Sequence, residues 1–306
     1  MGIAEAIIIT IIVASAPLLL AAIGELVVER AGVLNLGVEG MMIMGAVCGF
    51  IGTVESGSTL VGLVAAILAG MAMACLFAIL TLVLVANQVA TGLALTLLGL
   101  GLSGLVGEKY ASRAGIKLTK IHIPGLTDIP FIGPIVFGQD PLVYVAVALV
   151  VGVSWFLFRT RGGLILRAVG DNHTSAHSLG YSVVRVRFLA LLFGGACAGL
   201  GGAYLSLVST SQWLDNMTAG RGWIALALVV FATWLPWRLA IGALLFGAVG
   251  VLQFHVQALG VQIPAQFLSA LPYLTTIVVL VIISGNRALV RANTPAMLGK
   301  SFVPDR

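Results

Sequence analysis

The sequence predicts an all-α polytopic membrane protein, a single transmembrane domain over residues 1–306 with about nine membrane-crossing helices. Three observations lead to this fold class. The 306 residues are 60% hydrophobic and only 9% charged, whereas soluble domains carry roughly 25% charged residues. The mean hydropathy is +1.13. The apolar residues fall in long runs, and the basic residues gather between them. A soluble core could not absorb this apolar surface, so the bilayer is the expected solvent.

The apolar segments follow one another along the whole chain, and most approach the length of about 20 residues that a membrane-crossing helix needs. They are residues 3–23, 33–54, 58–86, 88–107, 142–158, 188–209, 223–235, 238–256 and 271–284. No basic residues precede the first segment, so we expect it to be retained and not cleaved as a signal peptide. The segments 223–235 and 271–284 are short. If they form one re-entrant pair, the topology after Gly222 reverses.

The second segment, residues 33–54, departs from a plain span. It contains several glycines, and Asn35 and Glu39 lie near its start. Acids at membrane depth usually face a protein interior or a watery cavity, and glycines allow a helix to break. We therefore expect a discontinuous helix near the centre of the fold. Two interpretations of Glu39 stay open: a role at a cavity, or a local cap or ion pair near the cytoplasmic surface.

Two polar loops carry most of the remaining information. Residues 108–141 are rich in proline and glycine, which predicts an extracytoplasmic loop with short turns that could serve as a docking surface. Residues 159–187 carry five arginines and one acid, Asp171. Because Lys and Arg collect on the cytoplasmic side, this second loop should face the cytoplasm. An odd number of crossings then places the N-terminus outside and the C-terminus in the cytoplasm, and most other basic residues agree with this orientation.

The middle of the 159–187 loop carries a helix signal. Asp171 and Asn172 are both good N-caps, the following HTSAHSL can form about two turns, and Gly180 is a good residue for the C′ position. Two interpretations are open at this point: a helix on which a soluble partner acts, or an ordered connecting loop. Tryptophans near the segment ends are expected to anchor helices at the membrane interfaces. They are Trp213, Trp223, Trp234 and Trp237.

The chain lacks the usual signs of an enzyme. No HExxH or CxxC spacing occurs, and the three cysteines lie far apart within apolar runs, as small core residues do. Gly299-Lys300-Ser301 resembles the end of a phosphate-binding loop, but Thr294 stands where that motif needs glycine. We expect no cofactor or metal on this chain and no nucleic acid partner. The segments also lack a mid-membrane Asp, Lys or Arg, which disfavours a proton-coupled carrier.

Four stretches together resemble the bacterial ABC-importer permeases of the nucleoside and simple-sugar group, relatives of the ribose and branched-chain amino-acid permeases. They are RAGVLNLGVEGMMIMGA at 30–46, ANQVATGLALTLLGLGLS at 86–103, LRAVGDNHTSAHSLGYSV at 166–183 and TAGRGWIALALVVFATWLP at 218–236. The similarity extends from about residue 5 to about residue 285. The chain departs from the family at Ala232, where glycine is usual, and at Asp171 and His173, where glutamate and proline are common.

The resemblance implies a permease subunit in the cell membrane, surrounded by lipid, that forms half of a pathway for nucleosides or simple sugars. A second, often non-identical permease chain would complete the pathway. A dimeric ATPase would bind ATP and Mg²⁺ on the cytoplasmic side, and an external lipoprotein would deliver the substrate. Residues 171–180 match the family's coupling helix. Its expected contact residues are Asp171, which would cap the helix, Asn172, His173, Ser175, and Ala176 and Leu179, which would enter an ATPase groove.

Segment 33–54 matches the family's central discontinuous helix, which implies that Asn35 and Glu39 lie near the pathway or its gate. Further candidates for the pathway are the polar residues of the apolar segments and their ends, namely Thr91, Thr96, Ser206 and Gln212. Branched-chain amino acids stay open as a different substrate class. Two different roles stay open as well: a stand-alone channel or secondary carrier for a small neutral solute, and a membrane scaffold that transports nothing.

Overall fold

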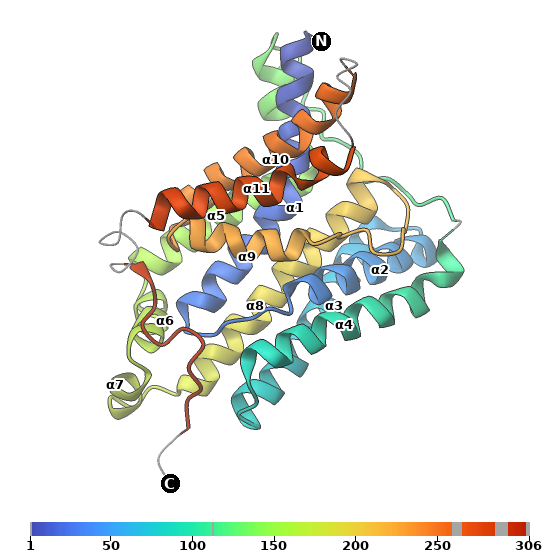
Figure 1. Cartoon of the computed structure of the whole chain (residues 1–306). Coiled ribbons are helices and arrows are strands. Elements are labelled where there is room, and N and C mark those ends of the chain that lie inside the picture. Colours follow the sequence, from blue (N-terminus) through green and yellow to red (C-terminus); the bar gives the residue numbers. More distant parts are fainter. Residues whose placement is uncertain (1, 112, 259–264, 285–292, 304–306) are drawn as a thin grey trace.

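The computed structural model describes residues 2–111, 113–258, 265–284 and 293–303, and all regular structure in these ranges is helical (Figure 1). The helices are α1 (Ile3–Arg30), α2 (Val38–Ser56), α3 (Thr59–Ala78), α4 (Gln88–Gly107), α5 (Pro141–Arg159), α6 (Arg161–Asp171), α7 (His173–Ser178), α8 (Val183–Tyr204), α9 (Arg221–Phe231), α10 (Pro236–Ala258) and α11 (Ala265–Ser284). Short helical turns are η1 (Ile79–Val83), η2 (Glu108–Tyr110), η3 (Gly133–Phe137) and η4 (Leu205–Ser209). The all-α fold class is confirmed for this part of the chain.

Within the residues that the structure describes, six helical stretches are long and apolar enough to cross a membrane. They are Ala4–Arg30, Val38–Ser56, Thr59–Val83, Gln88–Tyr110, Pro141–Arg159 and Val183–Ser209. The last three apolar segments also lie on helices, but their apolar parts are shorter, and Arg221–Phe231 has only 11 residues. A helix of that length spans about 16 Å, roughly half of the hydrocarbon layer. The structure therefore supports six spans by length and leaves the count of nine a prediction.

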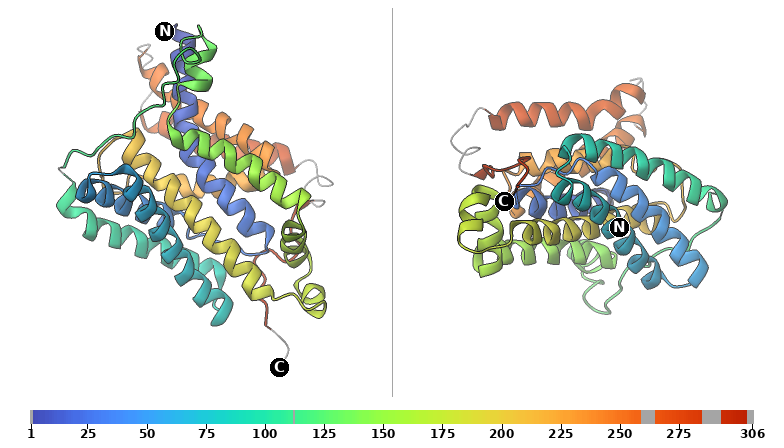
Figure 2. Two further views of the ribbon diagram at one scale, coloured as in Figure 1. Left: turned by 180° about the vertical axis from the view of Figure 1, so that it is seen from behind. Right: turned by 90° about the horizontal axis from the view of Figure 1, so that it is seen from below.

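Helix α8 packs between α1 on one side and α2 and α3 on the other (Figures 1 and 2). Two glycine pairs allow this close packing. A Cβ atom on Gly45 of α2 would collide with the backbone of Gly199 on α8, and one on Gly70 of α3 would collide with Gly195. Small residues at such crossings let helix backbones approach each other in a membrane, where lipid gives no hydrophobic drive to associate. The many glycines of these segments therefore serve helix packing.

The expected break of the second segment lies at its beginning and not within it. Helix α1 ends at Arg30, residues 31–37 form a mostly buried irregular connection, and α2 is continuous from Val38 to Ser56. The connection turns at Gly32, whose φ of +85° is a conformation that suits glycine. The prediction of a discontinuous helix is corrected to a buried break between two helices, because the later glycines of the segment are used for packing.

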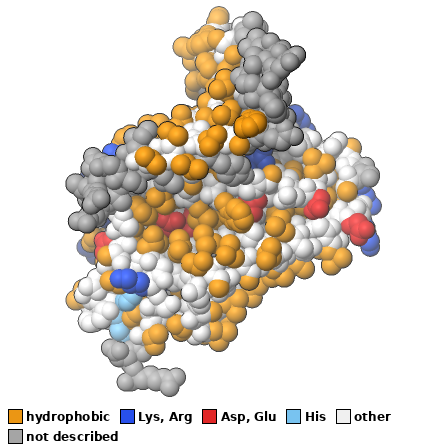
Figure 3. Space-filling view, in the orientation of Figure 1, with side chains coloured by type: hydrophobic (Ala, Val, Ile, Leu, Met, Phe, Trp, Pro, Cys, Tyr) orange, Lys and Arg blue, Asp and Glu red, His pale blue; other side chains and the backbone are white. Residues whose placement is uncertain are grey.

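Apolar side chains are spread over much of the face shown in Figure 3. Helices α3 and α4 expose large side chains such as Leu60, Leu68, Leu97 and Leu105, each more than half accessible. This is the surface expected of helices whose outer faces meet lipid or another membrane chain. Between α4 and α5, the described residues 108–111 and 113–140 form turns together with η2 and η3. The first turn of α1 and the α6–α7 pair lie at opposite ends of the molecule (Figure 1).

Candidate functional site

Helix α7 is held at both ends by its own sequence. The side-chain oxygen of Asn172 accepts a hydrogen bond from the Ser175 amide at 3.0 Å, which makes Asn172 the N-cap. Asp171 is the last residue of α6, so the expectation that it caps the helix is wrong. At the other end Gly180 has φ +87°. The amides of Gly180 and Tyr181 donate to the carbonyls of His177 at 2.8 Å and Ala176 at 3.1 Å, a Schellman motif. The predicted role of Gly180 is thus confirmed.

The predicted contact residues of α7 divide into two groups. Asp171, Asn172, Ser175 and Leu179 are exposed, Leu179 to 77%, and His173 is partly exposed. Ala176 is only 4% exposed, because it packs with Val169 and Val183 of the neighbouring helices. Ala176 therefore faces its own chain, and the expectation that it enters a partner's groove is corrected to a packing role.

The C-terminal segment, residues 293–303, lies against α7, and sequence reasoning missed this contact. The Phe302 ring meets the rings of His173 and His177 edge to face, with centroids 5.2 and 5.3 Å away. The Met297 amide donates to the Gly170 carbonyl at 2.9 Å, and the Gly299 amide donates to the Gly32 carbonyl at 3.2 Å. One segment thus contacts both the 159–187 loop and the connection between α1 and α2.

Arg187, at the start of α8, is fully buried. It contacts the end of α1, the C-terminal segment and α7. Its Nε donates to the Ala31 carbonyl at 3.1 Å, and its Nη1 donates to the Lys300 carbonyl at 2.9 Å. Its Nη2 lies 3.2 Å from Nδ1 of His173, which can accept while that nitrogen is unprotonated. Burial, with the nearby charges of Arg187 and Lys300, lowers the pKa of His173 below its usual value, which favours this neutral form.

A second polar cluster surrounds the buried connection between α1 and α2. Asn35 has no exposed surface, and its amide nitrogen donates to a carboxylate oxygen of Glu25 at 3.2 Å. Its side-chain oxygen accepts from the Gly37 amide at 3.0 Å, which shapes the backbone just before α2. Asn35 is therefore bonded to two parts of its own chain, α1 and the connection.

Helix α4 closes the other side of this connection. The Thr96 hydroxyl donates to the Leu36 carbonyl at 3.1 Å, and the side-chain oxygen of Gln88 accepts from the Leu34 amide at 2.9 Å. The three polar side chains Asn35, Gln88 and Thr96 are buried, and together they satisfy backbone groups of a stretch that lies outside both helices.

Glu39, in the first turn of α2, binds the start of α9. One carboxylate oxygen accepts from the Thr218 hydroxyl at 2.6 Å and the Gly220 amide at 2.8 Å, and the other accepts from the Gly222 amide at 2.6 Å. Glu39 is 3% exposed. A carboxylate at a helix N-terminus is favoured by the unpaired amides and the helix dipole. Glu39 is thus a cap, but for a helix distant in the sequence and not for its own.

Two of the three remaining predicted pathway residues, Ser206 and Gln212, lie apart from this cluster. Thr91 is half-buried on α4. Ser206 in η4 is fully buried and donates to the Ala46 carbonyl at 2.9 Å. Gln212 is exposed beyond η4. The structure thus brings Asn35, Glu39 and Thr96 together around the start of α2 and separates Ser206 and Gln212 from them. The roles of these residues in a pathway stay predictions.

A cleft of about 890 Å³ opens beside the segment that Glu39 holds. It is bounded by α1, η4, α9, α10 and α11. Met217, Ala219 and Arg221, which alternate with the Glu39 partners Thr218, Gly220 and Gly222, line one side of it. Its further polar lining comes from Thr10, Ser209 and Thr210. Glu39 therefore holds this wall of the cleft in position through residues that do not line the cleft themselves.

Comparison with known proteins agrees with this architecture. A chain of Haloferax volcanii, TsgC13, provisionally named a glucose ABC transporter permease protein, is 41% identical over 94% of both chains. The guanosine ABC transporter permease protein NupQ of Bacillus subtilis is 31% identical over 94% of this chain and 95% of its own. The nucleoside ABC transporter permease protein NupC of Lactococcus lactis is 30% identical over the same shares. A family model matches residues 7–283. This multi-pass cell-membrane protein therefore belongs to the family of permease components described as the branched-chain amino acid transport system.

Proposed function

We propose that this chain forms half of the membrane pathway of an ABC importer for nucleosides or simple sugars. The observation that carries the proposal is α7, a capped helix with an exposed Leu179 that is bonded through buried groups to the interior of the chain. The relatives named for glucose, guanosine and nucleosides support this substrate class. A separate ATPase would bind ATP and Mg²⁺, and a second permease chain, non-identical to this one, would complete the pathway.

A movement of the ATPase would displace α7, and a short series of contacts would pass that displacement to the interior of the chain. His173 on α7 contacts Arg187 of α8 and Phe302 of the C-terminal segment. Arg187 binds the Ala31 carbonyl at the end of α1, next to the connection that holds Asn35. The contact between Arg187 and Ala31 is buried, and the one between Arg187 and His173 is partly buried. Movement of α7 would therefore shift the break between α1 and α2, and alternating access would follow as rigid-body motion of packed helices.

The orientation that we propose has α7 and the C-terminus in the cytoplasm and the N-terminus outside. The contact between Phe302 and α7 supports one side for both, and the start of α1 lies at the other end of the molecule (Figure 1). An external binding lipoprotein would then meet the side that carries residues 108–141. A cysteine placed in that loop should react with a membrane-impermeant maleimide in intact cells, and one placed at Ser175 should react only after lysis.

The cleft beside α9 is our candidate for this chain's share of the pathway. Its mixture of apolar walls with Ser209, Thr210 and Arg221 suits a neutral, hydroxyl-rich substrate, which needs few charged partners. Ser209→Cys should react with a small hydrophilic thiol reagent, and transported substrate should slow that reaction. A Ser56→Cys variant at the exposed end of α2 is the control. Equal labelling of Ser209→Cys with and without substrate would rule the cleft out.

The coupling role is tested by changing Leu179 to Asp. Leu179 is 77% exposed, so the variant should insert and fold normally. A carboxylate at a protein contact should cost about 2 kcal/mol or more, so ATPase co-purification and ATP-driven uptake should fall by about thirtyfold or more. Leu126→Asp, an exposed leucine of the 108–141 loop, is the matched control. Normal uptake by Leu179→Asp would show that the coupling assignment is wrong.

Two competing functions predict different outcomes. A stand-alone channel or secondary carrier would keep its uptake when residues 171–180 are replaced by a Gly/Ser linker, whereas a permease subunit would lose both uptake and its ATPase. A permease for branched-chain amino acids would have a partner lipoprotein that binds those amino acids in calorimetry. We expect that lipoprotein to bind nucleosides or simple sugars.

A further inference from the structure

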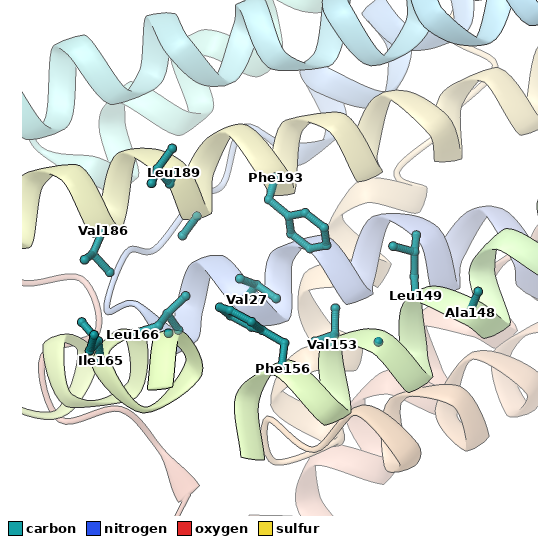
Figure 4. A pocket seen from close by; sticks show the side chains of 13 residues that line it. Val27, Ala148, Leu149, Val153, Phe156, Ile165, Leu166, Val186, Leu189 and Phe193 are labelled. Atoms are coloured by element: carbon teal, nitrogen blue, oxygen red, sulfur yellow. The ribbon is translucent and has the colours of Figure 1, made fainter. Parts of the chain in front are cut away.

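An apolar groove of about 510 Å³ lies between α5, α6 and α8, with Val27 of α1 at its base (Figure 4). Its further lining residues are Ala148, Leu149, Gly152, Val153, Phe156, Gly162, Ile165, Leu166, Val186, Leu189, Ala190 and Phe193. All of these side chains are apolar, so the groove offers no hydrogen-bonding side chain to a polar ligand. A groove of this composition fits a hydrocarbon chain and not a sugar or nucleoside.

The groove opens on a face with the apolar composition of a lipid-exposed surface. Val151 and Trp155 on α5 and Leu189 on α8 are 64%, 63% and 59% exposed. All three belong to stretches with the length and hydropathy of membrane spans. The molecules that surround such a surface in a cell membrane are phospholipids, whose acyl chains have the chemistry of the groove.

Three arginines lie at the end of the groove that α6 forms. Arg161 directly precedes the lining residue Gly162, Arg185 directly precedes Val186, and Arg159 lies about one helical turn after Phe156. All three are exposed. Among the described residues the one ion pair is between Arg113 and Glu55, far from here in the sequence, so these arginines have no carboxylate partner in that part of the chain. Exposed arginines next to a membrane surface attract anionic lipid headgroups.

We propose that this groove binds one anionic phospholipid, with an acyl chain between α5 and α8 and its phosphate at Arg159, Arg161 and Arg185. The apolar floor and the cationic rim are each explained by one half of this ligand. The bound lipid would also support α6, whose Ile165 and Leu166 line the groove and which leads directly into α7. The site would thus stabilise the position of the helix that we assign to energy coupling.

The test uses the full-length transporter complex in vesicles that contain phosphatidylglycerol or phosphatidylcholine with a photoreactive acyl chain. Cross-links mapped by mass spectrometry should fall on residues 148–156 and 186–193 and should favour phosphatidylglycerol. Changing the three arginines to glutamine should reduce that preference by about fivefold for each charge removed. Equal labelling by the two lipids in the unchanged protein would overturn the proposal.

A second variant tests the groove itself. A Cβ atom on Gly152 meets open space, so Gly152→Phe should fill the groove without a clash in the fold. Labelling of both groove peptides should then fall about tenfold or more. Gly101→Phe on α4, where a Cβ also meets open space, is the matched control and should label as the unchanged protein does. Unchanged labelling of Gly152→Phe, or cross-linking of the second permease chain in the groove, would refute lipid occupancy.

Discussion

Replacing Glu39 with glutamine would separate its role as a cap of α9 from a role in transport. The carboxylate accepts three hydrogen bonds, from the Thr218 hydroxyl and the amides of Gly220 and Gly222. A glutamine of the same shape offers one oxygen and one NH₂ group. The oxygen can still accept from Thr218 and Gly220, but the NH₂ group then faces the Gly222 amide, which is also a donor.

The cost of this change follows from these contacts. A buried amide donor left without an acceptor costs about 1–3 kcal/mol, and the two remaining bonds lose the contribution of the negative charge, about 1 kcal/mol each. The total is about 3–5 kcal/mol for Glu39→Gln. At roughly 2 °C per kcal/mol for a chain of this size, the apparent Tm should fall by about 6–10 °C.

The assay combines thermal unfolding of the purified complex with uptake measured below the Tm of the variant. Glu55→Gln is the matched control, because Glu55 is exposed and its ion pair with Arg113 should contribute little stability. If Glu39 is a cap, stability falls and folded Glu39→Gln complexes keep much of their uptake. An unchanged Tm together with lost uptake would refute this reasoning and place Glu39 in the transport step itself.

Three further predictions concern the C-terminal segment and the helix packing. Phe302→Ala should speed proteolysis of that segment while the Tm of the membrane helices stays the same, because it removes two edge-to-face contacts of about 1 kcal/mol each; equal proteolysis would contradict the contact. Because the pKa of His173 is lowered on folding, its stabilising contribution is fully present above about pH 6.5 and is lost as the pH falls through the folded pKa. Proteolysis of the segment should therefore accelerate on acidification, and His173→Gln should remove that pH dependence; a persistent dependence would implicate another group. Gly45→Leu should prevent recovery of monodisperse protein, since a side chain there collides with the Gly199 backbone, and a normal yield would show that this helix crossing is wrong.

Much of the fold was predictable because each segment that enters the lipid must satisfy its own backbone hydrogen bonds. A run of apolar residues must form a helix to satisfy its backbone in lipid, so the long segments were found from hydropathy. The last three segments were harder to interpret. Arg221–Phe231 is too short to cross alone, and its start depends on the carboxylate of Glu39, which lies far away in the sequence. Hydropathy contains no information about such a contact.

The candidate site shows the same division between local and distant interactions. The Gly180 end of α7 followed from turn chemistry, whereas Asp171 and Asn172 were equally good caps and only the structure distinguishes them. Two of the expected interface tryptophans are buried: Trp213 is 1% exposed and Trp234 is 3% exposed. The indole nitrogen of Trp234 donates to Glu29 at 2.6 Å. A tryptophan with a buried partner cannot be told from an interfacial one by its position in a segment.

Arg187 limits how α7 can move relative to the interior. Two of its three contacts are backbone carbonyls, those of Ala31 and Lys300, so its position depends on the path of the main chain on both sides. Separating α7 from Arg187 would remove one of its three acceptors, His173 Nδ1, and leave part of a buried guanidinium unpaired, which costs about 1–3 kcal/mol. Joint movement of α7, the C-terminal segment and the α1–α2 connection avoids that cost. A coupling mechanism in which α7 swings alone is therefore disfavoured.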